Sequence, residues 1–436
     1  MMDLKIFDRM ESQVRGYIRS FPVIFKQAKG SVLIDENNKE YIDFFSGAGT
    51  LNYGHNNPLL KQKLIEYLES DGVVHGLDMA TTAKKYFLET FERVLLKPRN
   101  WRYSLQFTGP TGTNAVEAAL KLARQVKGRA NVVSFTHGFH GVSAGSLAAT
   151  ANAKFRGAAG FPLANTTFMP YDGYMGPDVN TMAYFERMLE DPSSGLDKPA
   201  AVIVETVQGE GGVNVAGRNW LKELERLCRR HDMLLIVDDI QVGCGRTGNF
   251  FSFDALGIRP DIITLSKSLS GFGLPMSLVL MKPELDIWKP GAHSGTFRGN
   301  NLAFVTAAQA LDSYWTDDGF AAAIQRKERL VRDWLENIVH SYPQAGLSVR
   351  GRGLIQGLVL PTGGDAANRI ARAAFEEGVV IETSGAQDEV LKVLPALTIE
   401  DDRLMRGLEI IERSLGRVLA RTDASARVLK MGGKSR

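Results

Sequence analysis

Two ionisable residues stand at the ends of apolar runs that have the composition of buried strands. Lys267 follows the run Ile262–Leu265, and Asp238 directly follows the run that begins at Leu234. An amine and a carboxylate at the ends of two parallel strands would suit carbonyl chemistry with pyridoxal phosphate, because the amine can bond to the aldehyde and the carboxylate can keep the pyridine nitrogen protonated. Each residue also has a structural interpretation: Lys267 as a surface lysine and Asp238 as a salt-bridged carboxylate.

A segment rich in glycine and threonine joins the run ending at Phe107 to a helical pattern. Residues 108–114 read TGPTGTN. Backbone amides at a helix start, together with threonine hydroxyls, can hold a phosphate dianion. The alternative is a plain helix cap at Thr113 or Asn114. A P-loop is excluded, because no lysine follows at the required position.

The segment GFHG at residues 138–141 follows the run that ends at Phe135. Phe139 could stack on a cofactor ring. His137 and His140 could be metal ligands or satisfied structural histidines. No cluster of cysteines or carboxylates accompanies them in the sequence, so we predict no metal site.

Three short motifs match other classes of enzyme. GVSAG at residues 141–145 matches the nucleophile elbow of serine hydrolases, with Ser143 as the nucleophile, and stays a remote alternative. GCGRTG at 243–248 matches a dinucleotide-binding fingerprint, but no helix start follows it. LLIVDD at 234–239 resembles a Walker B strand without a Walker A motif.

Length and composition describe an ordinary globular chain. It has 436 residues, 44% of them hydrophobic, and a formal net charge of +3, so it has room for two or three domains and no electrostatic footprint for nucleic acid. Cys228 and Cys244 are too few for a disulfide scaffold and suit a reducing compartment. With no signal core and no run of about 18 apolar residues, we expect no membrane span and a cytoplasmic location.

Strand-like runs alternate with helical segments through the middle of the chain. The runs cover residues 104–107, 131–135, 201–205, 234–237, 262–265 and 277–281. Near-continuous apolar strands separated by helices predict an α/β fold with a mostly parallel sheet covered on both faces. Ligands bind such sheets beyond the carboxyl ends of the strands, where Asp238 and Lys267 are expected.

Two local patterns near the chain ends are different. Residues 32–34 and 41–45 read as short strands joined by the polar turn DENNK, which predicts a hairpin because asparagine tolerates the left-handed backbone. Residues 351–360 read as one strand that follows a long helical pattern.

These patterns divide the chain into a large central domain and a smaller α+β domain. We predict that the large domain covers residues 61–301. The small domain combines an N-terminal segment, residues 1–60, with residues 302–420. Residues 421–436 are expected to form a flexible tail.

Eight segments, in order, resemble the class III (ω-amino acid) aminotransferases of fold-type I. They are GHNNP at 54–58, TGTNAVEAA at 111–119, GFHG at 138–141, ETVQGEGG at 205–212, VDDIQ at 237–241, GRTG at 245–248, LSK at 265–267 and GTFRGN at 295–300. The resemblance covers residues 15 to 415. It implies a seven-stranded, mostly parallel sheet and pyridoxal 5′-phosphate as the cofactor.

The resemblance implies specific roles for the cofactor residues. Lys267 would be the Schiff-base lysine and proton shuttle, Asp238 the partner of the pyridinium nitrogen, and Gln241 a hydrogen-bonding residue near the ring hydroxyl. The implied cofactor-binding residues are Gly112, Thr113, Phe139, His140, Asp238, Gln241, Lys267 and Thr296. Thr296 would reach the phosphate of a neighbouring subunit, which implies a homodimer or a dimer of dimers.

The resemblance also points to residues that would choose the substrate. Glu205 is similar to a family glutamate that pairs with an arginine and releases it to grip an α-carboxylate. Lys392 stands where that arginine is expected, and a lysine supplies a point charge instead of a bidentate fork. Asp239 and Thr206 are two further departures, from Glu and Pro respectively.

The segments are similar to those of one subgroup of the family. Its members move an amino group from L-glutamate to L-aspartate 4-semialdehyde and form L-2,4-diaminobutyrate, in the first step of ectoine biosynthesis. Arg19 is a candidate for holding the substrate carboxylate. Ornithine, acetylornithine or 4-aminobutyrate as the amino donor are the alternatives within the family.

Overall fold

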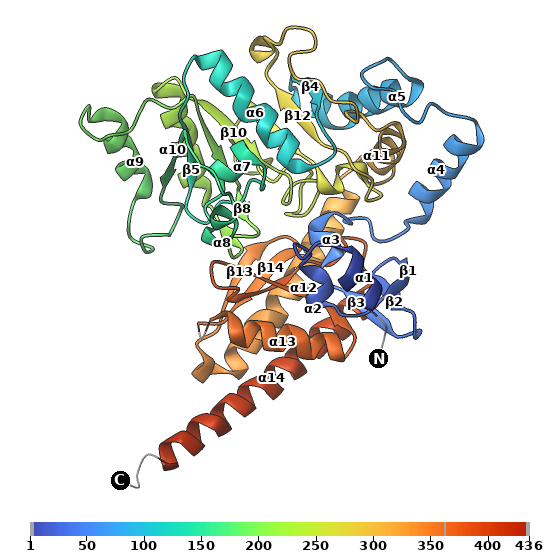
Figure 1. Ribbon diagram of the computed structural model, residues 1–436, viewed down its shortest axis with the longest axis vertical. Coiled ribbons are helices and arrows are strands. Elements are labelled where there is room, and N and C mark those ends of the chain that lie inside the picture. The colour runs from blue at the N-terminus through green and yellow to red at the C-terminus, as the bar shows by residue number, and fades with distance from the viewer. Residues whose placement is uncertain (1–3, 362, 433–436) are drawn as a thin grey trace.

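The computed structural model describes residues 4–361 and 363–432, and its largest sheet has seven strands (Figure 1). In spatial order these are β4 (Ser104–Phe107), β12 (Leu278–Met281), β11 (Ile262–Leu265), β10 (Leu234–Asp238), β7 (Ala201–Val204), β5 (Val132–Phe135) and β6 (Thr166–Met169). The two pairs that β12 forms are antiparallel and the other four are parallel. The predicted α/β fold is confirmed. β6 escaped prediction because its sequence, TTFM, is no continuous apolar run.

Both faces of this sheet are covered because its strands send alternate apolar residues to opposite sides. One face packs on α6 (Gly112–Lys127). The other forms the largest core, with α5 (Thr82–Phe91), α9 (Thr181–Glu190), α10 (Arg218–Arg230) and α11 (Asn301–Tyr314). α11 thus packs in the core of the large domain, although it extends beyond residue 301, the predicted end of that domain. Among the described helices, none is both long and apolar enough to cross a membrane.

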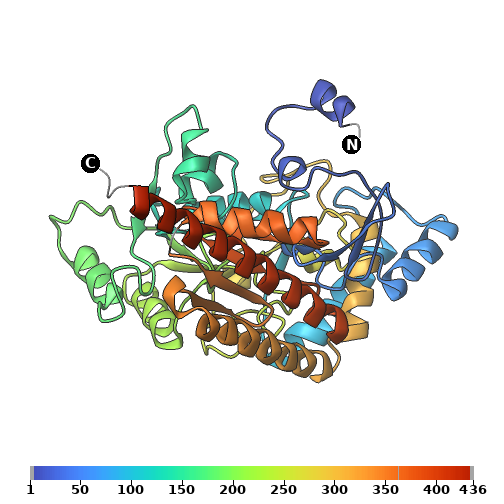
Figure 2. The same cartoon turned by 90° about the horizontal axis from the view of Figure 1, so that it is seen from below.

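The small domain joins the two ends of the chain. One sheet has the order β1 (Phe25–Lys29), β2 (Val32–Asp35), β3 (Glu40–Asp43), β15 (Val379–Val380), and another the order β13 (Ser348–Arg352), β14 (Ile355–Val359), β17 (Val390–Val393), β16 (Glu382–Ser384). β3 and β15 are parallel, so residues from both ends share one sheet. The helices α12 (Gly319–Ser341), α13 (Gly364–Glu376) and α14 (Asp401–Gly432) pack against these strands (Figure 2).

Short elements connect these layers. The helices are α1 (Lys5–Met10), α2 (Tyr17–Ser20), α3 (Ser46–Gly49), α4 (Pro58–Glu69), α7 (Ala144–Ala149) and α8 (Ala153–Gly157), and the single turns are η1 (Glu92–Leu96), η2 (Lys97–Arg99), η3 (Lys267–Ser270), η4 (Pro283–Leu285) and η5 (Pro343–Ala345). β8 (Val207–Gln208) and β9 (Asn214–Val215) form a small ribbon. Figure 1 shows α3 at the junction of the two domains.

Three local patterns can now be compared with the structure. The hairpin is confirmed as β2 and β3, and Asn38 in its turn has a φ of 65°. Residues 351–360 are two antiparallel strands instead of one, because Gly353 turns the chain with a φ of 62° and a Cβ there would lie 2.3 Å from the Arg246 carbonyl oxygen. In the region predicted as a tail, α14 continues to Gly432, and residues 433–436 lie outside the described chain.

Candidate active site

Asp238 and Lys267 lie at the same edge of the seven-stranded sheet, because β10 and β11 are adjacent and parallel. Lys267 Nζ donates a hydrogen bond to the Ala48 carbonyl oxygen of α3 at 2.9 Å. Lys267 has a φ of 49° and Ala48 one of 56°. Such left-handed geometry is costly for residues with a side chain and is concentrated at functional sites. The N-terminal segment therefore contributes directly to the surroundings of this lysine.

The surroundings of Lys267 make its ammonium group easier to deprotonate than that of a solvent-exposed lysine. Burial lowers the pKa of Lys267, and the Lys392 ammonium lowers it further, while the carboxylate of Glu210 acts in the opposite direction. Desolvation penalises the ammonium more than the amine, so the balance is a lowered pKa. An amine with a lowered pKa can attack a carbonyl carbon and can later accept or deliver a proton.

Asp238 is held by three hydrogen bonds. Its Oδ2 accepts one from His140 Nδ1 at 2.7 Å, and its Oδ1 accepts one each from Thr264 Oγ1 at 3.1 Å and the Ile240 amide at 3.2 Å. Burial opposes protonation of His140, but the hydrogen bond and charge of Asp238 outweigh it, and the pKa of His140 lies above its usual value. His140 is thus placed to orient Asp238 from behind.

The start of α6 is a capped helix N-terminus, the alternative to a dedicated anion turn. Thr111 is the N-cap, and its amide donates to Asn114 Oδ1 at 3.2 Å, so the cap lies ahead of the predicted Thr113 or Asn114. Gly112 follows, and a Cβ there would lie 2.9 Å from the Ile240 side chain. Gly112 and Thr113 thus open the helix, where free amide groups favour an anion.

Ser143 belongs to the same polar cluster as Thr113. Its Oγ donates to Glu117 Oε1 at 2.7 Å and lies 2.6 Å from Thr113 Oγ1, which also lies 2.6 Å from Ser146 Oγ. A serine nucleophile needs a base such as histidine. Since Ser143 is bonded to a carboxylate and to hydroxyl groups at the N-terminus of α7, the hydrolase interpretation fails.

Phe139 lies on the wall of a cavity of about 500 Å³, which Glu210 and residues 383–386 also line. Its amide donates to Glu205 Oε2 at 3.0 Å, which ties the backbone at Phe139 to the end of β7. Burial raises the pKa of Glu205 to about 8, with the charge of Asp238 adding to the effect and His140 opposing it. Glu205 therefore carries a proton at neutral pH.

Lys392 is paired with carboxylates other than Glu205. Its side chain is fully buried, and its Nζ lies 2.7 Å from Glu210 Oε1 and 2.9 Å from Glu382 Oε1. Glu205 instead binds the backbone behind Phe139. The expected Glu205–Lys392 pair is therefore replaced by Glu210–Lys392, because the chain after β7 brings the second glutamate of ETVQGEGG to β17.

Gln241 links the two ends of the site. Its Nε2 donates to Glu210 Oε1 at 2.8 Å and to the Ala48 carbonyl oxygen at 3.1 Å, the same oxygen that Lys267 uses. Its Oε1 is buried and has no hydrogen-bond partner among the described residues. Gln241 therefore lies beside Lys267 with one acceptor still available.

The two departures Asp239 and Thr206 meet at one residue, Ser252. The Ser252 amide donates to Asp239 Oδ2 at 3.1 Å, and Thr206 Oγ1 donates to Ser252 Oγ at 2.6 Å. Arg352 Nη2 donates to the Ser252 carbonyl oxygen at 2.6 Å. Burial raises the pKa of Asp239 to about 7. The pair thus forms a hydrogen-bond network behind the site.

Arg19 and Thr296 lie apart from this constellation within the described chain. Arg19 is exposed and donates to the carbonyl oxygens of Arg15 and Gln13 and to Gln13 Oε1, so it is bound within the N-terminal segment. Thr296 is exposed in the stretch before α11, next to Phe297, whose side chain is 71% exposed. Among the described residues, no hydrogen bond or ion pair joins either side chain to Lys267.

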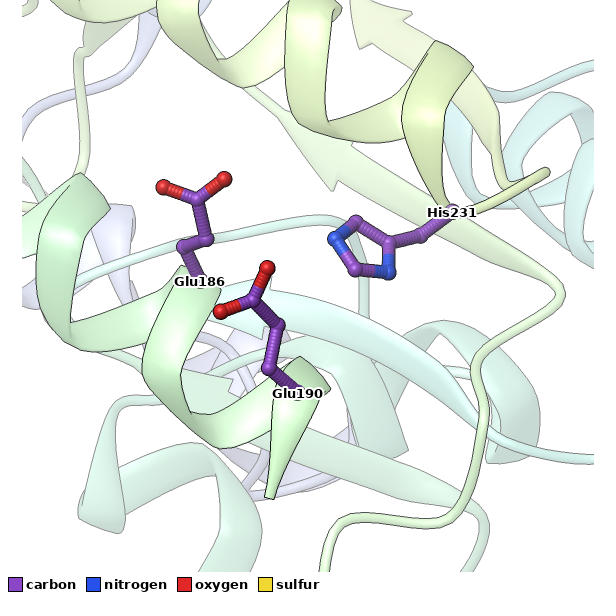
Figure 3. A group of neighbouring side chains, drawn as sticks. All are labelled: Glu186, Glu190 and His231. Atoms are coloured by element: carbon purple, nitrogen blue, oxygen red, sulfur yellow. The ribbon is translucent and has the colours of Figure 1, made fainter. Parts of the chain in front are cut away.

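A separate group of possible metal ligands lies on the surface, where Glu186 and Glu190 of α9 approach His231 after α10 (Figure 3). Arg226 and Arg230 pair with Glu186 at 2.9 and 2.6 Å, and Arg230 pairs with Glu190 at 2.7 Å. Both carboxylates are thus neutralised by arginines, and the group serves to join α9 to α10.

The residues at the sheet edge fit pyridoxal phosphate. The α6 amides offer a place for the phosphate, Asp238 one for the ring nitrogen, Lys267 an amine for the aldehyde, and Gln241 Oε1 an unused acceptor for a hydroxyl group. These parts follow different strands but meet at the carboxyl edge of one sheet, where such ligands bind.

Two residues of the site were missed by sequence reasoning. Glu210 lies five residues after Glu205 in the segment ETVQGEGG. The sequence therefore contained the residue that pairs with Lys392, but the prediction assigned that pairing to Glu205. Glu382 carried no signal, because it reaches Lys392 only through the antiparallel register of β16 and β17.

Known proteins resemble this chain along almost its whole length. The family model described as "Aminotransferase class-III" matches residues 15–415. A diaminobutyrate–2-oxoglutarate transaminase of Bordetella parapertussis is 80% identical over 100% of both chains, and one of Halomonas elongata is 59% identical over 95% of this chain and 99% of its own.

A comparison with solved structures also finds an aminotransferase. The ornithine aminotransferase of Toxoplasma gondii ME49 superposes with a TM-score of 0.82 at 28% identity, over 96% of this chain and 95% of its own. With the geometry at the sheet edge, these likenesses fix the family and its prosthetic group. Pyridoxal 5′-phosphate is the cofactor, and the chain belongs to the class III aminotransferases.

Proposed function

We propose that the enzyme transfers an amino group between L-glutamate and L-aspartate 4-semialdehyde, giving 2-oxoglutarate and L-2,4-diaminobutyrate, as the first step of ectoine biosynthesis. The observation that carries aminotransfer chemistry is the lowered pKa of Lys267 beside Asp238 at one sheet edge. The choice of substrate is supported by the relatives named diaminobutyrate–2-oxoglutarate transaminase at 80% and 59% identity.

The residues at the sheet edge would divide the chemical work. Pyridoxal 5′-phosphate supplies an aldehyde and an electron-accepting ring. Lys267 Nζ would take the proton from the reacting carbon of the substrate and return it later. Asp238, oriented by His140, would hold a proton on the ring nitrogen. Gly112 and Thr113 would bind the phosphate, and Phe139 would stack on the ring.

The substrate end would alternate between two kinds of ligand. Glu210 would neutralise Lys392 while a distal amine reacts, and Lys392 would bind the α-carboxylate of glutamate when Glu210 moves away. This assigns to Glu210 the role first expected of Glu205. Glu205 would support Phe139 as a neutral acid. Arg19 remains a proposed ligand for the carboxylate of the diamino acid.

We also propose a homodimer or a dimer of dimers in the cytoplasm. Thr296 would reach the phosphate of the neighbouring active site, which agrees with its exposure and with exposed Phe297 beside it. Free, buried Cys228 and Cys244 suit a reducing compartment. Light scattering after gel filtration tests the assembly, and a monomer that is fully active would contradict it.

A panel of amino donors tests the reaction itself. The purified holoenzyme is given 2-oxoglutarate with L-2,4-diaminobutyrate, ornithine, acetylornithine or 4-aminobutyrate, and glutamate formation is followed. We expect the highest kcat/KM for L-2,4-diaminobutyrate. A higher value for any of the other three amines would reject the proposed substrate while leaving the family assignment intact.

A further inference from the structure

Lys392 serves two carboxylates at once, and this leaves the cluster short of positive charge. Its Nζ lies between Glu210 and Glu382, and Glu382 stands directly opposite it in the β16–β17 register. Glu210 also accepts a hydrogen bond from Gln241 and has a pKa lowered to about 2 by Lys392 and Lys267 against the penalty of burial. The ammonium of Lys392 is thus matched by Glu210, and Glu382 is the carboxylate left over.

The groups around Glu382 do not balance it. The charged groups that act on Glu382 are Lys392 on β17, Glu210 after β8 and Lys267 on η3. Burial and the charges of Glu382 and Glu210 also raise the pKa of Tyr17 on α2. Lys267 is committed to the cofactor in the loaded enzyme. Burial raises the pKa of Glu382 to about 7 despite Lys392, as expected when two carboxylates share one ammonium.

The location of Glu382 suits contact with a substrate. Its side chain is only 10% exposed, and Thr383 and Ser384, which follow it on β16, line the cavity that Phe139 and Glu210 also line. A chain of polar contacts joins Glu382 to Lys267: Lys392 bridges Glu382 and Glu210, and Gln241 donates both to Glu210 and to the Ala48 carbonyl oxygen that Lys267 uses. A molecule whose distal amine reacts at Lys267 would therefore bring its other end near Glu382.

We propose that Glu382 binds the α-ammonium group of an α,ω-diamino acid while the distal amine of that substrate reacts at Lys267. This inference rests on the proposed function and adds the residue that selects its substrate. Glutamate presents no second ammonium, because its only amine is the one that reacts. 4-Aminobutyrate equals 2,4-diaminobutyrate without the α-amine, so it isolates the contribution of Glu382.

The test compares these two amines in three holoenzyme variants. In Glu382→Gln, kcat/KM for 2,4-diaminobutyrate should fall about 10- to 100-fold, the range for a hydrogen bond to a charged group, while that for 4-aminobutyrate stays unchanged. Glu382→Asp keeps the charge and should keep much of the preference. Glu389→Gln, the same change at a carboxylate that accepts the Gln387 amide, is the control.

A single-turnover reaction with glutamate distinguishes two roles of Glu382: binding of the substrate's α-ammonium group and positioning of Lys392. We expect an unchanged rate in Glu382→Gln. Equal losses with both amines, or a loss with glutamate, would overturn the inference, because Glu382 would then act only by holding Lys392. If Glu382→Gln does not fold, a Glu382→Asp variant that loses activity equally with both amines would overturn it too.

The outcome also distinguishes this inference from the proposed function. If the wild-type enzyme prefers ornithine, the reaction assignment fails, and ornithine against 5-aminovalerate becomes the matched pair for Glu382. A wild-type enzyme that uses each diamino acid no better than its counterpart without the α-amine would overturn the inference whatever the preferred chain length.

Discussion

Asp238 ends β10 and Lys267 follows β11, two adjacent parallel strands of the large sheet, whereas Glu382 and Lys392 face each other on antiparallel strands of the small domain. In the first pair, Asp238 is oriented by Thr264 of β11 and by His140 in the loop after β5, whereas Lys267 Nζ donates to the Ala48 carbonyl oxygen of α3. The second pair depends on Glu210, which arrives from the other domain. The residues of the cofactor end thus stand at one edge of a continuous sheet, whereas the charged cluster at the substrate end is assembled from both domains.

The largest loss of activity is expected from a substitution at the cofactor end. Lys267→Ala removes both the nucleophile and the proton carrier, so we expect turnover to fall by at least about 10⁴-fold with every amine. Borohydride should no longer fix the cofactor to the chain. Substantial transamination by this variant would refute the assignment of Lys267.

Asp238→Asn should be the next most damaging change. It removes the charge that stabilises a protonated ring nitrogen, and we expect kcat to fall on the order of 10²- to 10³-fold for glutamate and diamino acids alike. Asp239→Asn is the matched control, since Asp239 bonds to Ser252 on the far side and should tolerate an amide. A loss confined to one amine would contradict a role on the cofactor side.

At the substrate end, Glu210→Gln should act selectively. It takes away the charge that neutralises Lys392, so kcat/KM for 2,4-diaminobutyrate should fall about 10- to 100-fold while the glutamate half-reaction falls much less. Stopped-flow measurement of the two half-reactions separates these effects. Equal losses in both half-reactions would argue against alternating use of Lys392.

The preference for a diamino acid should depend on pH. With a pKa of about 7, Glu382 is protonated at lower pH and cannot hold an ammonium, so the ratio of kcat/KM for 2,4-diaminobutyrate over 4-aminobutyrate should rise severalfold between about pH 6 and pH 7.5, before the α-ammonium of the substrate itself loses its proton. The ratio cancels groups that act on both amines. In Glu382→Gln it should be flat, and a wild-type ratio that falls with pH would contradict this role.

The smallest effect is expected at Glu205. Because its pKa of about 8 leaves it protonated at neutral pH, Glu205→Gln replaces one neutral group by another that can still accept from the Phe139 amide. We expect activity within about threefold of wild type, a change below 1 kcal/mol in the barrier. Glu205→Ala, which loses the acceptor, should be clearly worse in the same assay.

The two ends also differ in how far the sequence predicts them. Lys267 and Asp238 could be found because each stands at the carboxyl end of a buried apolar run, and parallel strands bring such residues to one edge of the sheet. Six strands of the large sheet followed from apolar runs, and the count of seven followed from the family resemblance; β6 was not located. The resemblance to the class III aminotransferases, whose motifs occur here in the same order, then identified Gln241 and Phe139 as cofactor-binding candidates.

The substrate end resisted prediction because its residues meet across long separations. Lys392 was located, but its partners depend on the register of β16 against β17 and on the path of the chain after β7. Neither the register nor the chain path can be predicted from a local sequence pattern. The turn at Gly353 is a different case because it is local: Gly351, Gly353 and Gly357 all stand in the run, and the run alone does not indicate which of them reverses the chain.

The parallel pairing of β3 with β15 has a consequence for synthesis on the ribosome. The N-terminal strands emerge first but cannot complete their sheet until residues 379 and 380 have been made. The central sheet, formed from residues 104 to 281, needs no such late partner. Since domains generally fold as the chain grows, the layer that holds Asp238 and Lys267 can form first, and the nascent chain gains its power to discriminate between amines last.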